Sequence, residues 1–214
     1  AGLMTGPVLA LWLAALLLAA LAAAVNFGPL QADASRVLST PSCFAIAWLA
    51  YPFVKSLHEL GHALAVRVVG GAVHEVGISL LLPTPAPYVD ASAASAFPRR
   101  RRALVSAAGI IVELALAALA MLAWMLLSPG LLRDTAMVVL LICTVSTLVF
   151  NANPLLRLDG YHLLCDALQL PNLAVRSQAW WGAAWRRRDG LEQPLPAGAL
   201  ARGEAKWLAL YAPA

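Results

Sequence analysis

Four long apolar segments constrain the fold of this chain more than any other feature. They cover about residues 4–26, 43–69, 103–128 and 135–153. A helix needs about 20 apolar residues to cross the hydrocarbon core of a bilayer. Hydrophobic residues make up 61% of the chain, whereas soluble domains are about 45–50% apolar. The sequence therefore predicts an α-helical polytopic membrane protein with about four transmembrane helices.

The segment between the second and third apolar runs is too polar and too rich in proline to cross a membrane. It covers residues 70–102, and near its start apolar Val76, Ile78 and Leu80 alternate with small residues. Alternation with a period of two is typical of a strand. We therefore expect a small β-hairpin or sheet between the second and third transmembrane helices.

The distribution of lysine and arginine predicts how the chain lies in the membrane. Most basic residues fall in the loop 70–102 and in the tail, namely Arg99, Arg100, Arg101, Arg102, Arg176, Arg186, Arg187, Arg188, Arg202 and Lys206. The other side carries Arg36 and Arg133. Because cytoplasmic loops have an excess of basic residues, both termini and the hairpin are expected in the cytoplasm. These residues flank apolar runs, so nucleic acid is not an expected partner.

The chain is expected to divide into three parts. Residues 1–42 hold an N-terminal transmembrane helix and a loop, in which "NFGPLQADASRVLSTPS" breaks the helical pattern. Residues 43–170 hold a core of three helices and the hairpin loop 70–102. Residues 171–214 form a cytoplasmic or interfacial tail, because tryptophans beside arginines in "QAWWGAAWRRR" are typical of a membrane-interface anchor. The end, "AKWLALYAPA", resembles the start of a further helix, as in a piece of a longer protein.

The motif "HELGH" in the second apolar segment carries the first chemical signal. His58 and His62 are four residues apart, so on a helix they share one face and can hold one metal ion. Glu59 lies beside that face, where it can act on water without being a ligand. Ionisable groups inside a membrane span cost several kcal/mol and seldom persist without a role or a partner. The pattern therefore indicates a zinc hydrolase.

A third metal ligand is needed, because catalytic zinc usually has three protein ligands and leaves a fourth position for water. The candidate lies in "NANPLLRLDGYH", residues 151–162, at the end of the fourth apolar segment. Pro154 cannot continue a helix and Gly160 loosens the backbone, so the segment should unwind and turn Asp159 inward. An aspartate beside a glycine is more often a turn residue, and the pairing with "HELGH" favours the ligand role.

Together the two motifs resemble those of the site-2 proteases, zinc metalloproteases that cut substrates within or beside the membrane. The family signatures are H-E-x-x-H in one helix and N-x-x-P-x-x-x-L-D-G in a later one, and both are complete here. The resemblance covers roughly residues 43–165. It implies one zinc ion per chain, held by His58, His62 and Asp159, with Glu59 as the catalytic base.

The function implied by this resemblance is hydrolysis of peptide bonds in membrane-associated substrates near the cytoplasmic face. The bilayer is the other expected partner. We expect the stretch 73–82 to hold an unwound substrate in extended form by adding a strand. Two alternatives stay open. One is a catalytically silent zinc-binding scaffold, which would not need Glu59. The other is a metal transporter, which would need ligands along a path and often shows inverted repeats.

Four further polar residues in or near the apolar segments need partners. Lys55 lies nearly on the histidine face of its helix, and Glu113 in "GIIVELALA" is its natural partner. Glu113 is expected either to pair with Lys55 or to accept the free N–H of a zinc-ligating histidine. Asn151 and Asn153 have two equally weighted roles, which are hydrogen bonds to an extended substrate and capping of carbonyls freed by the proline.

Overall fold

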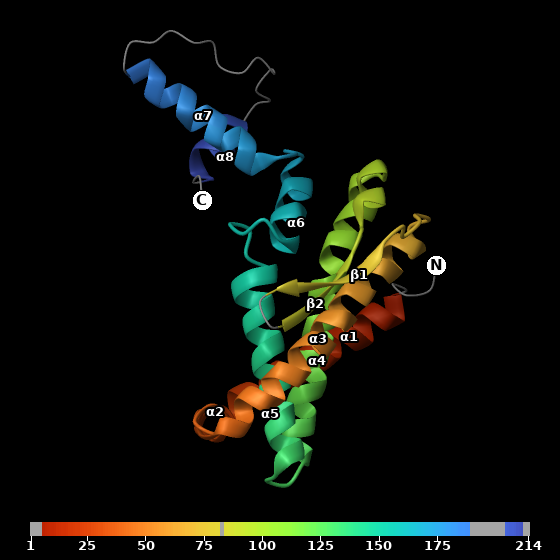
Figure 1. Cartoon of the computed structure of the whole chain (residues 1–214), viewed down its shortest axis with the longest axis vertical. Helices are drawn as coiled ribbons and strands as arrows, with labels where there is room; N and C mark the ends of the chain where they lie inside the picture. The colour runs from red at the N-terminus through yellow and green to blue at the C-terminus, as the bar shows by residue number, and fades with distance from the viewer. Residues whose placement is uncertain (1–5, 82–83, 189–203, 212–214) are drawn as a thin grey trace.

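The computed structural model describes residues 6–81, 84–188 and 204–211 (Figure 1). Its helices are α1 (Gly6–Val25), α2 (Phe27–Leu38), α3 (Pro41–Val68), α4 (Arg99–Leu126), α5 (Leu131–Val145), α6 (Asp159–Leu168), α7 (Leu173–Arg188) and α8 (Glu204–Leu210). The strands are β1 (Val76–Leu81) and β2 (Thr84–Val89). A 3₁₀ turn, η1 (Ser92–Ala96), precedes α4, and a π-helix, η2 (Ser146–Asn151), continues α5. Leu82 and Arg202, on which two of the sequence predictions rest, lie outside the described residues.

Three helical segments in the described part of the chain are long and apolar enough to cross a membrane. They are α1, α4 and Leu131–Asn151, which joins α5 and η2. The helix α3 adds a fourth only when it is taken together with α2, across a bend of 96°. Length and composition thus indicate a membrane protein with three spans, or up to four.

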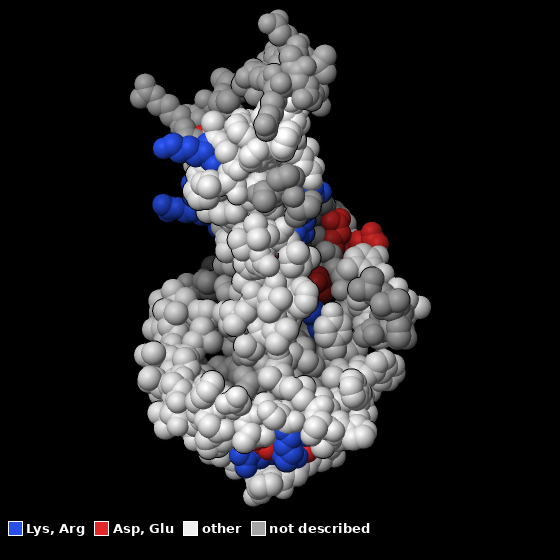
Figure 2. Space-filling model, turned by 90° about the vertical axis from the view of Figure 1, so that its left-hand side faces the viewer, with Lys and Arg blue, Asp and Glu red and all other residues white. Residues whose placement is uncertain are grey.

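The segment expected to be a break between the first two spans is a helix, α2. Pro29 falls in its first turn and Pro41 in the first turn of α3, positions where a proline costs no helical hydrogen bond. A polar cluster fixes α2 to the far ends of α4 and α5. Asp33 accepts a hydrogen bond from Trp124 Nε1 at 2.7 Å, and Arg36 pairs with both Asp33 and Asp134. In Figure 2, charged atoms gather at this end of an otherwise largely uncharged lower half.

The helix α4 lies at the centre of the bundle, in contact with α1, α3 and α5 (Figure 1). Trp12 Nε1 donates a hydrogen bond to Ile111 O at 3.2 Å and so attaches α1 to α4. Gly61 allows α3 to approach α4 closely. A Cβ at Gly61 would lie 2.8 Å from Val112 Cγ2 and 3.1 Å from Ala108 O.

The two strands form the small antiparallel hairpin that the sequence predicts. The register runs from Val76 opposite Val89 to Leu81 opposite Thr84, and β2 packs beside α3. The alternating residues Val76, Ile78 and Leu80 are exposed. Tyr88 donates a hydrogen bond to Glu75, which raises the pKa of the tyrosine above its ordinary value.

The fourth apolar segment ends in the irregular backbone that the sequence predicts around Pro154. The helix first widens into η2, where Ala152 N donates to Thr147 O at 2.7 Å across five residues. The chain then turns and restarts as α6 at Asp159. Gly160 makes this turn possible, because a Cβ there would lie 2.5 Å from the backbone of Ala152.

The close crossing at Gly61 yields a test of the bundle. We expect Gly61→Ala to destabilise the protein by about 1–3 kcal/mol, because its Cβ overpacks against α4. Thermal unfolding in detergent, followed by circular dichroism, measures the change. Gly28→Ala is the matched control, since its Cβ meets nothing within 4 Å. An equal loss of stability in both variants would contradict the close packing.

Candidate metal centre

His58 and His62 from α3 and Asp159 from the start of α6 form a group that could hold a metal ion. Their ligand atoms converge closely. Asp159 Oδ2 lies 3.1 Å from His58 Nε2 and 3.3 Å from His62 Nε2, and the two nitrogens are 3.1 Å apart. Bonds of about 2.0–2.1 Å at tetrahedral angles would place ligand atoms about 3.3 Å apart. The three side chains are thus spaced as the corners of a small tetrahedral site.

The hydrogen bonding of His62 and Asp159 fits a cation between the three side chains. His62 Nδ1 donates to the backbone oxygen of Val105 at 2.8 Å, because a carbonyl can only accept. Its Nε2 lone pair therefore faces His58 Nε2 and Asp159 Oδ2, and that oxygen is buried without a well-aligned hydrogen bond. Three electron-pair donors at this spacing fit a metal ion.

Gly109 in α4 forms the wall behind the two histidines. A Cβ at this position would lie 2.3 Å from His58 Nε2 and 2.6 Å from His62 Nε2. Contacts this short do not occur in folded proteins, so any side chain here would displace the histidines. The absence of a side chain at Gly109 is therefore part of the geometry of the site.

Glu113 lies one helical turn beyond Gly109 and is fully buried. Lys55 Nζ donates to its Oε1 at 2.7 Å, and His58 Nδ1 lies 3.0 Å from the same oxygen. The sequence offered these two contacts as alternatives. The structure forms the Lys55 pair as a hydrogen bond and places His58 Nδ1 close to the same oxygen without a well-aligned hydrogen bond. Thr147 and Asn151 donate to Oε2 at 2.7 and 2.9 Å.

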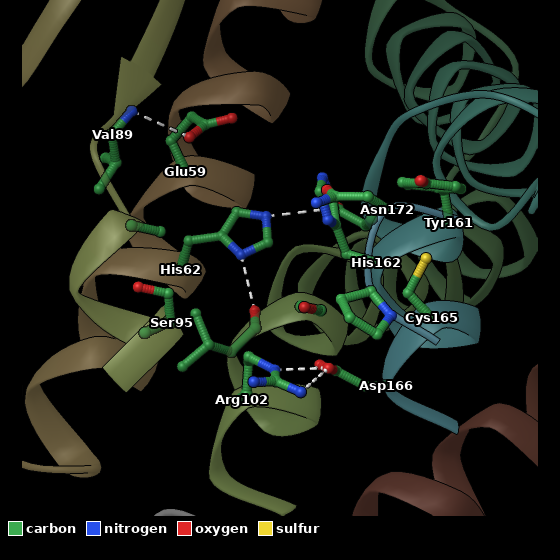
Figure 3. A pocket seen from close by; sticks show the side chains of 16 residues that line it. Glu59, His62, Val89, Ser95, Arg102, Tyr161, His162, Cys165, Asp166 and Asn172 are labelled. Carbon is green, nitrogen blue, oxygen red and sulfur yellow. Dashed lines mark hydrogen bonds and ion pairs between the residues drawn. The ribbon is translucent and has the colours of Figure 1, made fainter. Parts of the chain in front are cut away.

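Glu59, the predicted base, lines a cavity of about 520 Å³ together with His62 and Asp159. Figure 3 shows its carboxylate turned toward the end of β2, where Val89 N donates to Glu59 Oε2 at 3.1 Å. Asp90 N donates to Glu75 O within the hairpin, so Val89 N–H points away from β1. The far wall of the cavity includes Arg102, which pairs with Asp166.

The two asparagines differ in their surroundings. Asn153 contacts the local backbone, donating to Val149 O at 3.1 Å and accepting from Leu155 N at 3.0 Å. These contacts match the capping alternative. Asn151 instead joins the Glu113 cluster and also donates to Ser146 Oγ at 3.3 Å. Residues five apart share one face of a π-helix, and this turns Asn151 toward Glu113.

Sequence reasoning missed several contributors to the site. Ser146 and Thr147 form a polar pair in an apolar span, and this is a signal that could have drawn attention to them. Gly109 is one turn before Glu113, which was a weaker signal. The backbone groups of Val89 and Val105 leave no trace in a sequence, because every residue carries them.

Comparison with family models, curated proteins and solved structures finds no match to this chain. The interpretation of the site therefore depends on its own residues and geometry.

The position of Gly109 predicts a selective loss of metal binding. We expect Gly109→Ala to lower metal affinity by at least tenfold, because its Cβ collides with both imidazoles. Competition with a chromophoric chelator measures the affinity of the purified protein for zinc. Gly61→Ala is the matched control in the same helix crossing, since its Cβ meets Val112 and Ala108 but no ligand. Unchanged affinity in Gly109→Ala would exclude this metal site.

Proposed function

We propose that the chain is an intramembrane zinc metalloprotease that hydrolyses peptide bonds of membrane-associated substrates. The observation that carries the proposal is the convergence of His58, His62 and Asp159 from two helices that are far apart in the sequence. In this assignment, the two sequence motifs are those of a site-2 protease, and the fold brings their metal-ligating residues together.

The donor set favours zinc. Two imidazoles and one carboxylate are typical of catalytic zinc sites, in which a fourth position is left for water. His62 has its tautomer fixed by Val105 O, which leaves Nε2 free as a ligand. The chemistry that a zinc ion supplies at such a site is activation of water and polarisation of the peptide carbonyl.

Glu59 is the proton carrier in this proposal. It takes a proton from the attacking water and delivers it to the amine that leaves as the peptide bond breaks. Its carboxylate lines the same cavity as His62 and Asp159. In the structure it accepts the N–H of Val89, so it must turn from β2 toward the substrate. Catalytic contacts commonly tighten only when substrate is bound.

The edge of β2 that faces away from β1 lies beside α3 and Glu59, and we propose it as the place for the substrate backbone. Val89 N–H points away from β1 and toward Glu59. A substrate carbonyl that accepts this N–H would release Glu59 and hold the substrate as an added strand beside the base. Main-chain pairing of this kind suits a helical substrate that has been unwound before cleavage.

A zinc-binding scaffold and a metal transporter are the alternatives. A scaffold would have no use for a glutamate that lines the cavity beside the ligands. A transporter needs successive ligand sets, and the described residues contain one group, His58, His62 and Asp159. The protease therefore accounts for more of the site than either alternative.

Exchange of Glu59 for glutamine tests the protease directly. We expect Glu59→Gln to retain zinc and to cut about 10²–10⁴-fold more slowly, since it removes the general base. Metal content and cleavage of single-span reporter peptides in liposomes are measured side by side. Asp134→Asn, in the distant cluster with Arg36, is the control and should cut normally. Bound zinc without any Glu59-dependent cleavage of a broad reporter panel would favour the scaffold.

The sidedness of the site is also part of the proposal, with the N-terminus, the hairpin and the tail on the cytoplasmic side. It rests on the basic residues near the hairpin and in the tail. We expect Ser79→Cys, on β1, to react with an impermeant maleimide only after the cells are opened. Ser39→Cys, between α2 and α3, should react in intact cells. The native cysteines are all buried and provide a low background. The reverse pattern would contradict the orientation.

A further inference from the structure

The contacts of Glu113 divide between its two oxygens in an unequal way. Oε2 accepts hydrogen bonds from two neutral donors, Thr147 and Asn151. Oε1 faces Lys55 Nζ at 2.7 Å and His58 Nδ1 at 3.0 Å, with a longer contact from Ser146 Oγ at 3.3 Å. One carboxylate oxygen is thus shared between a fixed positive charge and the rear nitrogen of a candidate metal ligand.

A lysine in this largely buried position of α3 costs free energy, because its charge is removed from water. Its side chain is 15% exposed, lies within α3 and donates to Ser146 Oγ at 2.6 Å as well as to Glu113. A buried ion pair often stabilises a protein no more than apolar residues of similar size would. Stability alone therefore gives weak grounds for a lysine beside a metal centre.

The two residues act in opposite directions on His58. A carboxylate behind a ligating imidazole makes that imidazole a stronger electron donor. A cation on the same carboxylate oxygen withdraws negative charge from the contact and reduces this effect. It also adds positive charge near the place where a metal cation would bind.

We propose that Lys55 and Glu113 form an antagonistic pair that sets the metal affinity of the site, with Glu113 raising it and Lys55 lowering it. The inference rests on the metal-binding half of the proposed function and is independent of proteolysis. A less basic imidazole leaves a bound ion the stronger Lewis acid. Lys55 would therefore lower the affinity for the metal and raise the reactivity of the bound ion. Lys55 and Glu113 are positioning residues in this scheme, because they act through His58.

The zinc affinities of purified single variants test whether Glu113 raises the affinity and Lys55 lowers it. We expect Glu113→Gln to bind zinc about 10–100-fold more weakly, the usual effect of losing such a partner. Lys55→Met should bind zinc several-fold more tightly than the original chain, since Glu113 keeps its contacts with Ser146, Thr147 and Asn151. Lys55→Arg retains the charge and should restore the original affinity. Chelator competition gives the affinities, and thermal unfolding without metal gives the stabilities.

A second measurement separates tuning from loss of structure. The visible absorption of the cobalt-substituted protein should keep its four-coordinate intensity in Lys55→Met, because all three ligands are retained. If Lys55→Met and Glu113→Gln both weaken zinc binding in step with their loss of stability, the pair is structural and the inference is overturned. If Glu113→Gln fails to fold, the sign of the Lys55→Met effect decides alone. Absence of zinc binding in the unaltered chain would overturn the metal site itself, whereas unaltered affinities in both variants would overturn only the inference.

Discussion

The buried carboxylate of Glu113 is the contact on which the rest of the site depends. It belongs to α4, and it meets Lys55 and His58 from α3 and three donors from η2. An ionised carboxylate inside an apolar bundle is tolerable only when such partners surround it. Each partner is therefore held in place by the need to satisfy Glu113. The position of His58 is one result of this arrangement, and the candidate metal centre includes it.

The irregular end of the fourth apolar segment leaves backbone groups without helical hydrogen bonds. Backbone groups freed from a helix near a membrane must find other partners. Asn153 supplies one, and Tyr211 Oη from the end of α8 donates to Pro154 O at 3.0 Å. The tail thus supplies a hydrogen bond to a backbone carbonyl at the break that turns Asp159 toward the histidines. The apolar cluster of α6, α7 and α8 likewise crosses the boundary expected at residue 170, with Tyr161 on one side and Leu173 and Tyr211 on the other.

The sequence revealed those features that residue type alone determines. Spacing of four placed His58 and His62 on one face, and Pro154 with Gly160 indicated the break before Asp159. The amphipathic helix α2 was missed because Gly28 and Pro29 suggested a turn, although a proline in the first turn leaves a helix intact. The π-helix was also missed, since Ser146 and Asn151 share a face only after the turn has widened. Features that depend on close approach, such as Gly109 behind the imidazoles, required the packed structure.

The contact of Glu59 with Val89 connects the hairpin to the chemistry of the site. The carboxylate of Glu59 is directed to an N–H at the edge of β2. That N–H is unpaired within the hairpin, so the glutamate satisfies it while no other chain is present. In the proposed protease, a peptide that pairs with the same edge would take over the N–H and free the carboxylate at the place where its own backbone lies. Under this proposal, the binding of an extended chain would also free Glu59 to act as a base, and hydrolysis would be restricted to substrates held as a strand.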